Sequence, residues 1–444
     1  MVSPAWTDNR LTRLLRNSHS NPGWRSGADG CRASGWVVRR SETGRQRSST
    51  AGLARCVTVS PAATRVLLVT ASIGEGHNSS TAALAYALRR VRPGCDLRTV
   101  DIFALMGSGS GPFFRCVYRG AVQLAPMLHE LWYQALRRLA ALHWFYRQVV
   151  GARVGRALTG EVVGFRPHIV VSTYPLGTAG ICWLRRRRLL EVPVIALLSD
   201  FAPHAFWVYP GVDEYFVLND NGRAAMSAIA PGVRVTVCAP PVAPTFHPRN
   251  RQDIVAIRQR YGIPQEALAV LVSCGALGLG SITAAVDAVL AAGPGCHAVV
   301  VCGRNNRLQA TLRRRGERAD RLLVLGWVED MPTLMAAVDV VVNNAGGVTA
   351  TEALACGRAL VMFRPLAGHG RASAAALAEA GLAVVCTQRR KLTSLLAQWI
   401  EQPLLLRTAQ ARALKHATAH RLEQAAQAIL LHTARDAADS STNP

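Results

Sequence analysis

The chain has 444 residues, half of them hydrophobic, which is enough to bury the cores of two or three domains. Its formal net charge is +24, with +7 in residues 1–64 and +9 in residues 136–188. No zinc-finger spacing or aromatic RNA-binding signature accompanies this charge, so no nucleic-acid partner is expected. An anionic membrane surface or phosphorylated small molecules fit the charge as partners.

The eleven cysteines are scattered without a C-x-x-C pair. Neither a disulfide framework nor a zinc site is therefore expected, and this usage suits a reducing cytosol. The uncharged run from Ala267 to Val286 has the length of a membrane span. Gly275, Gly278 and Gly280 break it into strand, loop and helix, so we expect no span there.

Residues 1–62 are rich in Arg, Ser and Gly and show no sustained apolar period. This composition is typical of a disordered basic arm, a targeting-like leader or a translated upstream start. A secretory signal would need a continuous apolar core, which the segment lacks. We therefore exclude it from the fold.

From Arg65 the chain alternates between strand and helix patterns. A strand at 65–71 leads through a glycine loop at 72–77 to a helix from Asn78 to Arg90. Residues 128–158 are expected to be helical and basic. Further strands are predicted at 96–103, 168–174, 192–200, 214–220 and 233–238.

A proline-rich stretch at 239–248 separates this half from a second one that begins again with a strand, Leu268 to Ser273. Two such halves predict an α/β fold of two doubly wound, Rossmann-like domains facing a cleft, at 63–240 and 251–440 with a linker at 241–250. The elements predicted in the second half are strands at 297–303, 322–326, 338–343 and 383–386 and helices at 331–337 and 348–355.

The stretch from Val324 to Met362 carries the clearest functional pattern. Gly346 and Gly347 let the backbone approach a ligand where a helix begins, and unpaired N–H groups at such an N-terminus suit a phosphate. Glu352, one turn inside, could bind a sugar hydroxyl. The T-x-x-E spacing of Thr349 and Glu352 equally fits a capping box, and both interpretations stay open.

A second glycine loop, S-C-G-A-L-G-L-G-S (273–281), also leads into a helix. Its Gly275, Gly278 and Gly280 would let backbone amides surround a diphosphate. Arg304, beside Asn305 after the next strand, could neutralise the charge of that group. Together with Gly346 and Gly347, this loop predicts a nucleotide site in the second domain.

Two loops of the first half carry titratable groups at the carboxyl ends of strands. The loop S-I-G-E-G-H places His77 after Gly74 and Gly76, where a neutral imidazole could take a proton from an acceptor hydroxyl. A histidine that bonds locally at a helix N-terminus is the alternative.

The other loop, S-D-F-A-P-H-A-F-W (199–207), offers Asp200 and His204 as catalytic or substrate-positioning groups. Its aromatic residues Phe201, Phe206 and Trp207 would form an apolar platform for the acceptor. The alternative is an aspartate that bonds its own turn and aromatic rings that pack on the first domain.

Residues 131–156 combine five aromatic side chains with five arginines in a helical stretch. This mixture fits a segment that lies in the interface of an anionic membrane. It fits equally well a pair of packed helices with solvated arginines, and the sequence does not separate the two. The aromatic residues are Trp132, Tyr133, Trp144, Phe145 and Tyr146.

With these motifs in order, the chain resembles the monogalactosyldiacylglycerol synthase and processive diacylglycerol glucosyltransferase family, which is related to the GlcNAc transferase of peptidoglycan-precursor synthesis. The resemblance runs from about residue 65 to about residue 400. It is carried by G-E-G-H (74–77), S-D-F-A-P-H-A-F-W-V (199–208), C-G-A-L-G-L-G (274–280), V-V-C-G-R-N (300–305), G-W-V-E-D-M-P (326–332) and N-N-A-G-G-V-T-A-T-E-A (343–353).

The resemblance implies an inverting GT-B glycosyltransferase that uses neither metal nor cofactor. It implies a nucleotide sugar, usually a UDP-sugar, in the second domain and a lipid hydroxyl in the first, with the enzyme cytoplasmic and peripheral on the inner face of the membrane. His77, or else Asp200, would be the general base. The acceptor side would include Gly74, Gly76, His204 and Trp207. The donor side would include Gly275, Gly278, Gly280, Arg304, Asn305, Gly346, Gly347, Thr349, Glu352 and His369.

One segment departs from the family pattern. Where the family commonly has P-G-Q-E-x-x-N, this chain has A-G-H-G-R-A-S (367–373), so His369, Gly370 and Ser373 replace Gln, Glu and Asn. The family's preference for galactose or glucose therefore does not carry over. A GT-B-fold UDP-GlcNAc 2-epimerase and a non-catalytic nucleotide- or lipid-binding protein are the alternative functions.

Overall fold

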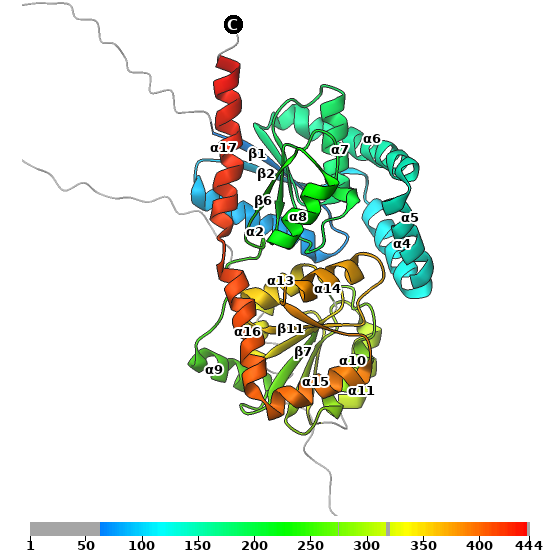
Figure 1. The fold of residues 1–444 in the computed structure, drawn as a ribbon, viewed down its shortest axis with the longest axis vertical. Coiled ribbons are helices and arrows are strands. Elements are labelled where there is room, and N and C mark those ends of the chain that lie inside the picture. Colours follow the sequence, from blue (N-terminus) through cyan, green and yellow to red (C-terminus); the bar gives the residue numbers. More distant parts are fainter. Residues whose placement is uncertain (1–62, 274, 317–319, 442–444) are drawn as a thin grey trace, which may run out of the picture. The chain divides into compact units, whose positions relative to one another are not determined.

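The structure, a computed structural model, describes residues 63–273, 275–316 and 320–441. The predicted basic arm at 1–62 lies outside these residues. Two six-stranded sheets are present, and every strand pair in them is parallel. The predicted fold class, two doubly wound α/β sheets, is confirmed (Figure 1).

The first sheet has the strand order β2-β1-β3-β4-β5-β6. Along β1, Val66 and Leu68 pack into one apolar cluster while Leu67 and Val69 pack into another, so both faces of the sheet are covered. A strand buried on both faces needs a continuous apolar run. The strands are β1 (Arg65–Thr70), β2 (Asp96–Asp101), β3 (Ile169–Ser172), β4 (Val194–Leu197), β5 (Glu214–Val217) and β6 (Arg234–Val237).

Helices surround this sheet, and most of the predicted boundaries in this half differ from the structure by one to three residues, with two larger differences in kind. The strand expected at 96–103 ends at Asp101, because the Asp101 carboxylate accepts a hydrogen bond from the Phe103 amide and begins a helix. The helical stretch expected at 128–158 breaks at Leu139. The helices are α2 (Glu75–Val91), α3 (Ile102–Leu105), α4 (Ser110–Leu124), α5 (Pro126–Arg138), α6 (Ala140–Phe165), α7 (Pro175–Arg186) and α8 (Asp220–Ile229), with a short 3₁₀ turn η1 (Ala205–Trp207).

The second sheet has the order β12-β11-β10-β7-β8-β9 and is also covered on both faces. Its first strand and the helices at 331–337 and 348–355 begin and end at the predicted residues. The strands are β7 (Leu268–Ser273), β8 (Cys296–Val301), β9 (Leu322–Leu325), β10 (Val340–Asn343), β11 (Ala359–Phe363) and β12 (Ala383–Cys386). The helices are α9 (Arg251–Tyr261), α10 (Ile282–Ala291), α11 (Asn306–Gly316), α12 (Met331–Ala337), α13 (Val348–Ala355), α14 (His369–Glu379), α15 (Arg389–Glu401), α16 (Pro403–Thr418) and α17 (Leu422–Ser441).

The last helix, α17, lies with the first sheet although its sequence follows the second. Ala426 and Ile429 belong to the apolar cluster that contains Val66. His432 of the same helix approaches Glu214 of β5, with 2.6 Å between Nε2 and Oε2. Residues of the predicted 251–440 domain are therefore shared between the two halves. No helix among the described residues is both long and apolar enough to cross a membrane.

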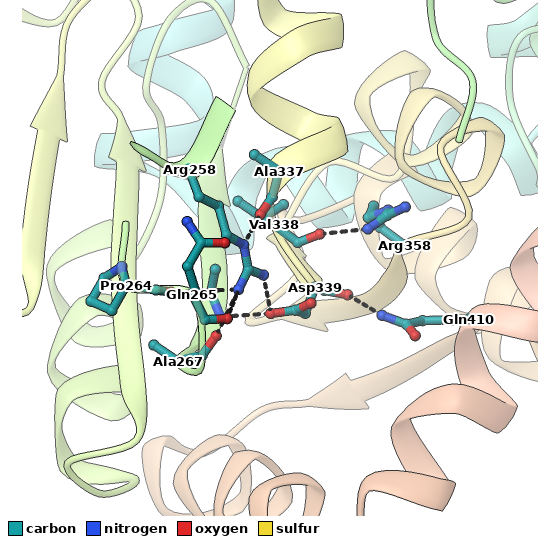
Figure 2. Close-up of polar contacts among 10 residues, drawn as sticks. Arg258, Pro264, Gln265, Ala267, Ala337, Val338, Asp339, Arg358 and Gln410 are labelled. Atoms are coloured by element: carbon teal, nitrogen blue, oxygen red, sulfur yellow. Dashed lines mark hydrogen bonds and ion pairs between the residues drawn. The ribbon is translucent and has the colours of Figure 1, made fainter. Parts of the chain in front are cut away.

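An ion pair between buried Arg258 and partly buried Asp339 holds the amino-terminal end of the second sheet together (Figure 2). The Arg258 guanidinium donates to the Asp339 carboxylate over 2.8 Å and to backbone carbonyls that include those of Ala337 and Gln265. The same Asp339 oxygen accepts from the Ala269 amide over 2.8 Å. The pair thus joins α9, β7 and the start of β10.

Asp339→Ala should lower the free energy of unfolding by about 3–5 kcal/mol, because it leaves the buried Arg258 charge without its partner. Urea unfolding followed by circular dichroism measures this loss. The matched control is Asp287→Ala, which breaks the exposed Arg315–Asp287 pair (2.9 Å) and should cost less than about 1 kcal/mol. Equal losses in the two variants would contradict a stabilising role for the buried pair.

Candidate functional site

Two cavities carry the polar residues that the sequence singles out. The first, the Glu352 cavity, has a volume of about 390 Å³ and is lined mainly by the second half. The second, the His77 cavity, has a volume of about 300 Å³ and is lined mainly by the first half. Parallel α/β sheets place their ligand sites at the carboxyl ends of the strands, and Ser273 at the end of β7 and Val301 at the end of β8 both line the Glu352 cavity.

The N-terminus of α13 opens into the Glu352 cavity. Thr349 and Glu352 both line it, and the helix begins after its N-cap residue Gly347 without a side-chain cap. The capping box that the T-x-x-E spacing allowed therefore does not form. Burial raises the pKa of Glu352 to about 8, because it disfavours the ionised carboxylate. A ligand that donates hydrogen bonds to the ionised form would stabilise that form.

Arg304 stands beside the same cavity. Its guanidinium lies 4.4 Å from the centre of the Trp327 ring and 3.1 Å from a carboxylate oxygen of Glu75. Glu75 comes from the start of α2 in the first half, and both Glu75 and Trp327 line the cavity. We did not predict either residue as part of the site, although both lie inside the quoted motifs G-E-G-H and G-W-V-E-D-M-P.

The predicted donor glycines divide into two groups. Gly275 lines the cavity, with φ at +73°. Gly280 and Gly346 instead allow close chain contacts, since an added Cβ would lie 2.1 Å from Asn344 and 2.7 Å from Ser373 respectively. Asn305 donates from its side-chain nitrogen to the Gly278 carbonyl over 3.2 Å. Gly278, Gly280, Asn305, Gly346 and Gly347 therefore shape the loops around the cavity without lining it.

His77 is held in one orientation by the end of β3. Its Nδ1 lies 3.0 Å from the Thr173 carbonyl oxygen, which can only accept, so Nδ1 carries the proton and Nε2 keeps its lone pair. The ring packs edge-on against Tyr174, with 4.7 Å between ring centres. Burial lowers the pKa of His77 below its ordinary 6.5, although the charge of Asp200 opposes this shift. A neutral, oriented imidazole in a cavity is suited to accept a proton.

Asp200, His204 and His369 meet in the His77 cavity. One Asp200 oxygen lies 3.2 Å from Nε2 of His369, and the other lies 4.0 Å from Nε2 of His204. Burial would raise the pKa of Asp200, but the adjacent His369 outweighs it and holds that pKa well below its usual range. Asp200 is therefore a much weaker base than His77. We predicted His369 for the donor side, and the structure places it against Asp200.

The remaining acceptor-side predictions are placed as follows. Trp207 is fully buried in the core of the first half, so the apolar platform of the His77 cavity is Phe206 and not Trp207. Gly76 lines the Glu352 cavity, where an added Cβ would lie 3.2 Å from the Val348 side chain. Gly74 precedes α2 in extended backbone with nothing within 4 Å of an added Cβ.

Helices α4, α5 and the start of α6 present apolar side chains to solvent, a surface we call the α4–α6 apolar face (neighbouring helices in Figure 1). On α5 the inward positions Tyr133 and Leu136 are buried, so this helix is apolar on both sides. An exposed apolar face of this extent marks a protein or membrane contact. It consists of Phe113, Phe114, Val117, Leu124, Met127, Leu128, Leu131, Trp132, Leu139, Trp144, Phe145 and Val149.

Comparison with known families confirms the resemblance. Residues 77–242 match the model described as monogalactosyldiacylglycerol (MGDG) synthase, and residues 276–380 match glycosyl transferases group 1. Processive diacylglycerol beta-glucosyltransferases of Bacillus cereus (strain G9842) and Bacillus subtilis (strain 168) are each 26% identical to the chain. These alignments cover 72% and 75% of this chain and 81% and 87% of the two relatives.

Solved structures show the same architecture. MurG of Acinetobacter baumannii superimposes with a TM-score of 0.53 at 18% identity, over 83% of this chain and 99% of that one. The glycosyltransferase SnogD of Streptomyces nogalater gives 0.54 at 17% identity, over 84% and 100%. UGT71G1 of Medicago truncatula, complexed with UDP-glucose, gives 0.55 at 10% identity, over 84% and 98%. The fold is therefore GT-B, as the resemblance implied.

Proposed function

We propose that this chain, a glycosyltransferase with the GT-B fold, transfers a hexose from a UDP-sugar to the hydroxyl group of a diacylglycerol-type lipid, with inversion at the anomeric carbon. The observation that carries the proposal is the start of α2. Its consecutive residues Gly76 and His77 line the Glu352 cavity and the His77 cavity respectively. A sugar held in the first cavity and a hydroxyl held in the second would thus approach each other at this point.

The Glu352 cavity supplies what a nucleotide diphosphate needs. The eight-residue helix α13 starts without a side-chain cap, so its N-terminus suits an anion, and Arg304 beside the cavity adds a positive charge. These groups stabilise the diphosphate as it leaves, which is the largest electrostatic demand of the reaction. Glu352 accepts hydrogen bonds from sugar hydroxyls deeper in the cavity.

The His77 cavity supplies the base. As the acceptor oxygen forms its bond to the anomeric carbon, Nε2 of His77 takes the hydroxyl proton, and the bond from that carbon to the diphosphate oxygen breaks. Asp200 stays ionised throughout and stabilises the imidazolium that forms, since its charge already acts on His77. The aromatic wall of the cavity, including Tyr118 and Phe206, suits a lipid acceptor.

The α4–α6 apolar face brings the enzyme to its lipid. Met127, Leu128, Leu131 and Trp132 project from one side of α5, and Trp132 also lines the His77 cavity. Burial of these side chains in the headgroup region would place the cavity mouth at the bilayer, and arginines such as Arg119 would meet anionic lipid. The enzyme is thus proposed to be peripheral on the cytosolic membrane face.

Incubation with radiolabelled UDP-glucose, UDP-galactose or UDP-GlcNAc and vesicles that contain diacylglycerol tests the proposal. A labelled glycolipid with the β-linkage is the expected product. Release of UDP together with a free 2-epimerised sugar would support the epimerase alternative instead. Tight UDP binding without any product from these sugars would support a non-catalytic binding protein.

The raised pKa of Glu352 predicts how donor binding depends on pH. Below about pH 8 the carboxyl is protonated, whereas a carboxylate that accepts from sugar hydroxyls must be ionised. Binding therefore releases one proton, and the Kd for UDP-glucose should fall about tenfold per pH unit from pH 6 to pH 8 and then level off. Isothermal titration calorimetry measures this dependence.

Two variants make the pH experiment specific. Glu352→Gln should bind UDP-glucose weakly and with no slope over this range. Glu379→Gln, which changes an exposed glutamate on α14, should keep the slope of the unmodified protein. Affinity of the unmodified protein that is constant from pH 6 to pH 8 would remove Glu352 as an ionised ligand of the sugar.

A further inference from the structure

The His77 cavity gathers an unusual set of titratable side chains. Its described lining includes four histidines, His77, His129, His204 and His369, but a single carboxylate, Asp200, and no arginine or lysine. One carboxylate needs only one cationic partner for an ion pair. Several imidazoles around one carboxylate are instead the ligand set that proteins use for divalent transition metals.

We propose that Asp200, His204 and His369 form a binding site for a divalent transition metal such as Zn²⁺. Each offers one ligand atom, and these atoms all lie within 4.8 Å of one another. The two printed separations are 3.2 Å from Asp200 to Nε2 of His369 and 4.0 Å from Asp200 to Nε2 of His204. Ligand atoms of a tetrahedral zinc ion lie roughly 3.3 Å apart, given metal–ligand bonds of about 2.0–2.1 Å. Small side-chain rotations therefore suffice.

The local fold presents the three ligands from short, well-anchored segments. Asp200 follows β4, and His204 precedes the turn η1, so both come from the loop at 198–204. His369 is the first residue of α14 in the second half. The rings of His204 and His369 meet edge-on with 5.8 Å between their centres, and both direct Nε2 at the Asp200 carboxylate. The metal would thus tie the two halves of the chain together at the cavity.

The ligand chemistry selects the class of ion. Mg²⁺ and Ca²⁺ prefer sites made of oxygen atoms, whereas two imidazoles and one carboxylate suit Zn²⁺, Fe²⁺, Co²⁺ or Ni²⁺. Three protein ligands leave at least one coordination position open toward the cavity. The site depends on His369, which stands where the resembled family commonly has glutamine, so it is a property of this chain and does not rest on the proposed sugar transfer.

Metal binding to the full-length protein tests the proposal directly. After incubation with Zn²⁺ and exhaustive dialysis, mass spectrometry for metals should find one zinc ion per chain. Co²⁺ added to the metal-free protein should give visible absorption bands typical of low-coordinate nitrogen and oxygen ligation. His369→Gln and Asp200→Asn should each weaken Zn²⁺ binding by about 100-fold or more, since each removes a ligand.

His420→Ala is the matched control, because it removes an exposed histidine outside the cavity; its zinc affinity should equal that of the unmodified protein. Circular dichroism melting of each variant checks that the fold is kept, and His204→Gln provides a second ligand deletion if one variant fails to fold. Loss of all zinc on dialysis would overturn the proposal and leave Asp200 and His369 as an ion pair only. Zinc retained equally by the ligand variants would assign it to adventitious surface binding and overturn the proposal as well.

Discussion

His77→Ala should reduce turnover by about 100- to 10,000-fold, because it removes the neutral, oriented imidazole that we propose takes the acceptor proton. The donor is proposed to bind in the other cavity, so the Kd for UDP should change by less than about twofold, within the spread expected for an independent site. Initial rates of glycolipid formation and calorimetric UDP titration measure the two quantities. Because the pKa of His77 is lowered, kcat of the unmodified enzyme, measured at saturating UDP-sugar so that donor binding by Glu352 does not contribute, should fall only below pH 6.5, as the imidazole becomes protonated.

The exposed His420→Ala variant serves as the control here too, and its rate should equal that of the unmodified enzyme. Full activity of His77→Ala would remove His77 from the mechanism. In that event Asp200 would be the base to test next, although its strongly acidic character makes it unsuited to the task.

Replacement of Met127, Leu128 and Leu131 by serine should abolish binding to vesicles of anionic phospholipid and diacylglycerol. Burial of one such side chain contributes about 1.5–3 kcal/mol, so loss of three should weaken the membrane partition by more than about 100-fold. All three side chains are at least 66% exposed, so the fold should be unaffected. Cosedimentation with vesicles measures the partition, and a short-chain acceptor in free solution should still be glycosylated at the original rate.

A matched triple variant makes the same kind of replacement elsewhere on the surface. Leu404, Leu405 and Leu431 are also exposed, and their replacement by serine should leave vesicle binding unchanged. Equal losses in the two triple variants would show that general hydrophobicity, and not the α4–α6 apolar face, governs the partition. Binding that survives in the first variant would rule out α5 as the docking element.

The elements of the second half were the most accurately predicted. The strand Leu268–Ser273 and the helices Met331–Ala337 and Val348–Ala355 match residue for residue. Their limits are set by local chemistry, namely continuous apolar runs for strands covered on both faces and a glycine or aspartate before each helix. The mismatch at β2 has the same kind of cause, since a single side chain, Asp101, caps a helix that ends the strand two residues before its predicted limit.

The site was predicted less completely than the fold. The sequence indicates that Gly275, Thr349, Glu352 and His77 serve two loop clusters, and the structure places each against a cavity. Phe201, Phe206 and Trp207 were all assigned to a platform because of their residue type, yet Phe201 and Trp207 are buried in the core and Phe206 alone of the three lines the cavity. Which of two adjacent residues faces the cavity depends on the short 3₁₀ turn η1, and that turn leaves no periodic signal in so short a segment.

The sequence by itself determined the two α/β halves, the glycine loops at their ligand-binding edges and the family that the chain resembles, because each follows from contiguous residues. Only the tertiary structure decided which residues share a cavity. Glu75 meets Arg304, and His369 meets Asp200, across more than a hundred residues of chain. Likewise, the aromatic and arginine residues of the 131–156 segment fitted packed helices and membrane-facing helices equally well. In the structure Tyr133 is buried while Leu131 and Trp132 are exposed, so α5 has two apolar sides. Contacts between distant segments depend on how the sheets pack. The apolar periodicity within one segment does not indicate which other segment will lie beside it.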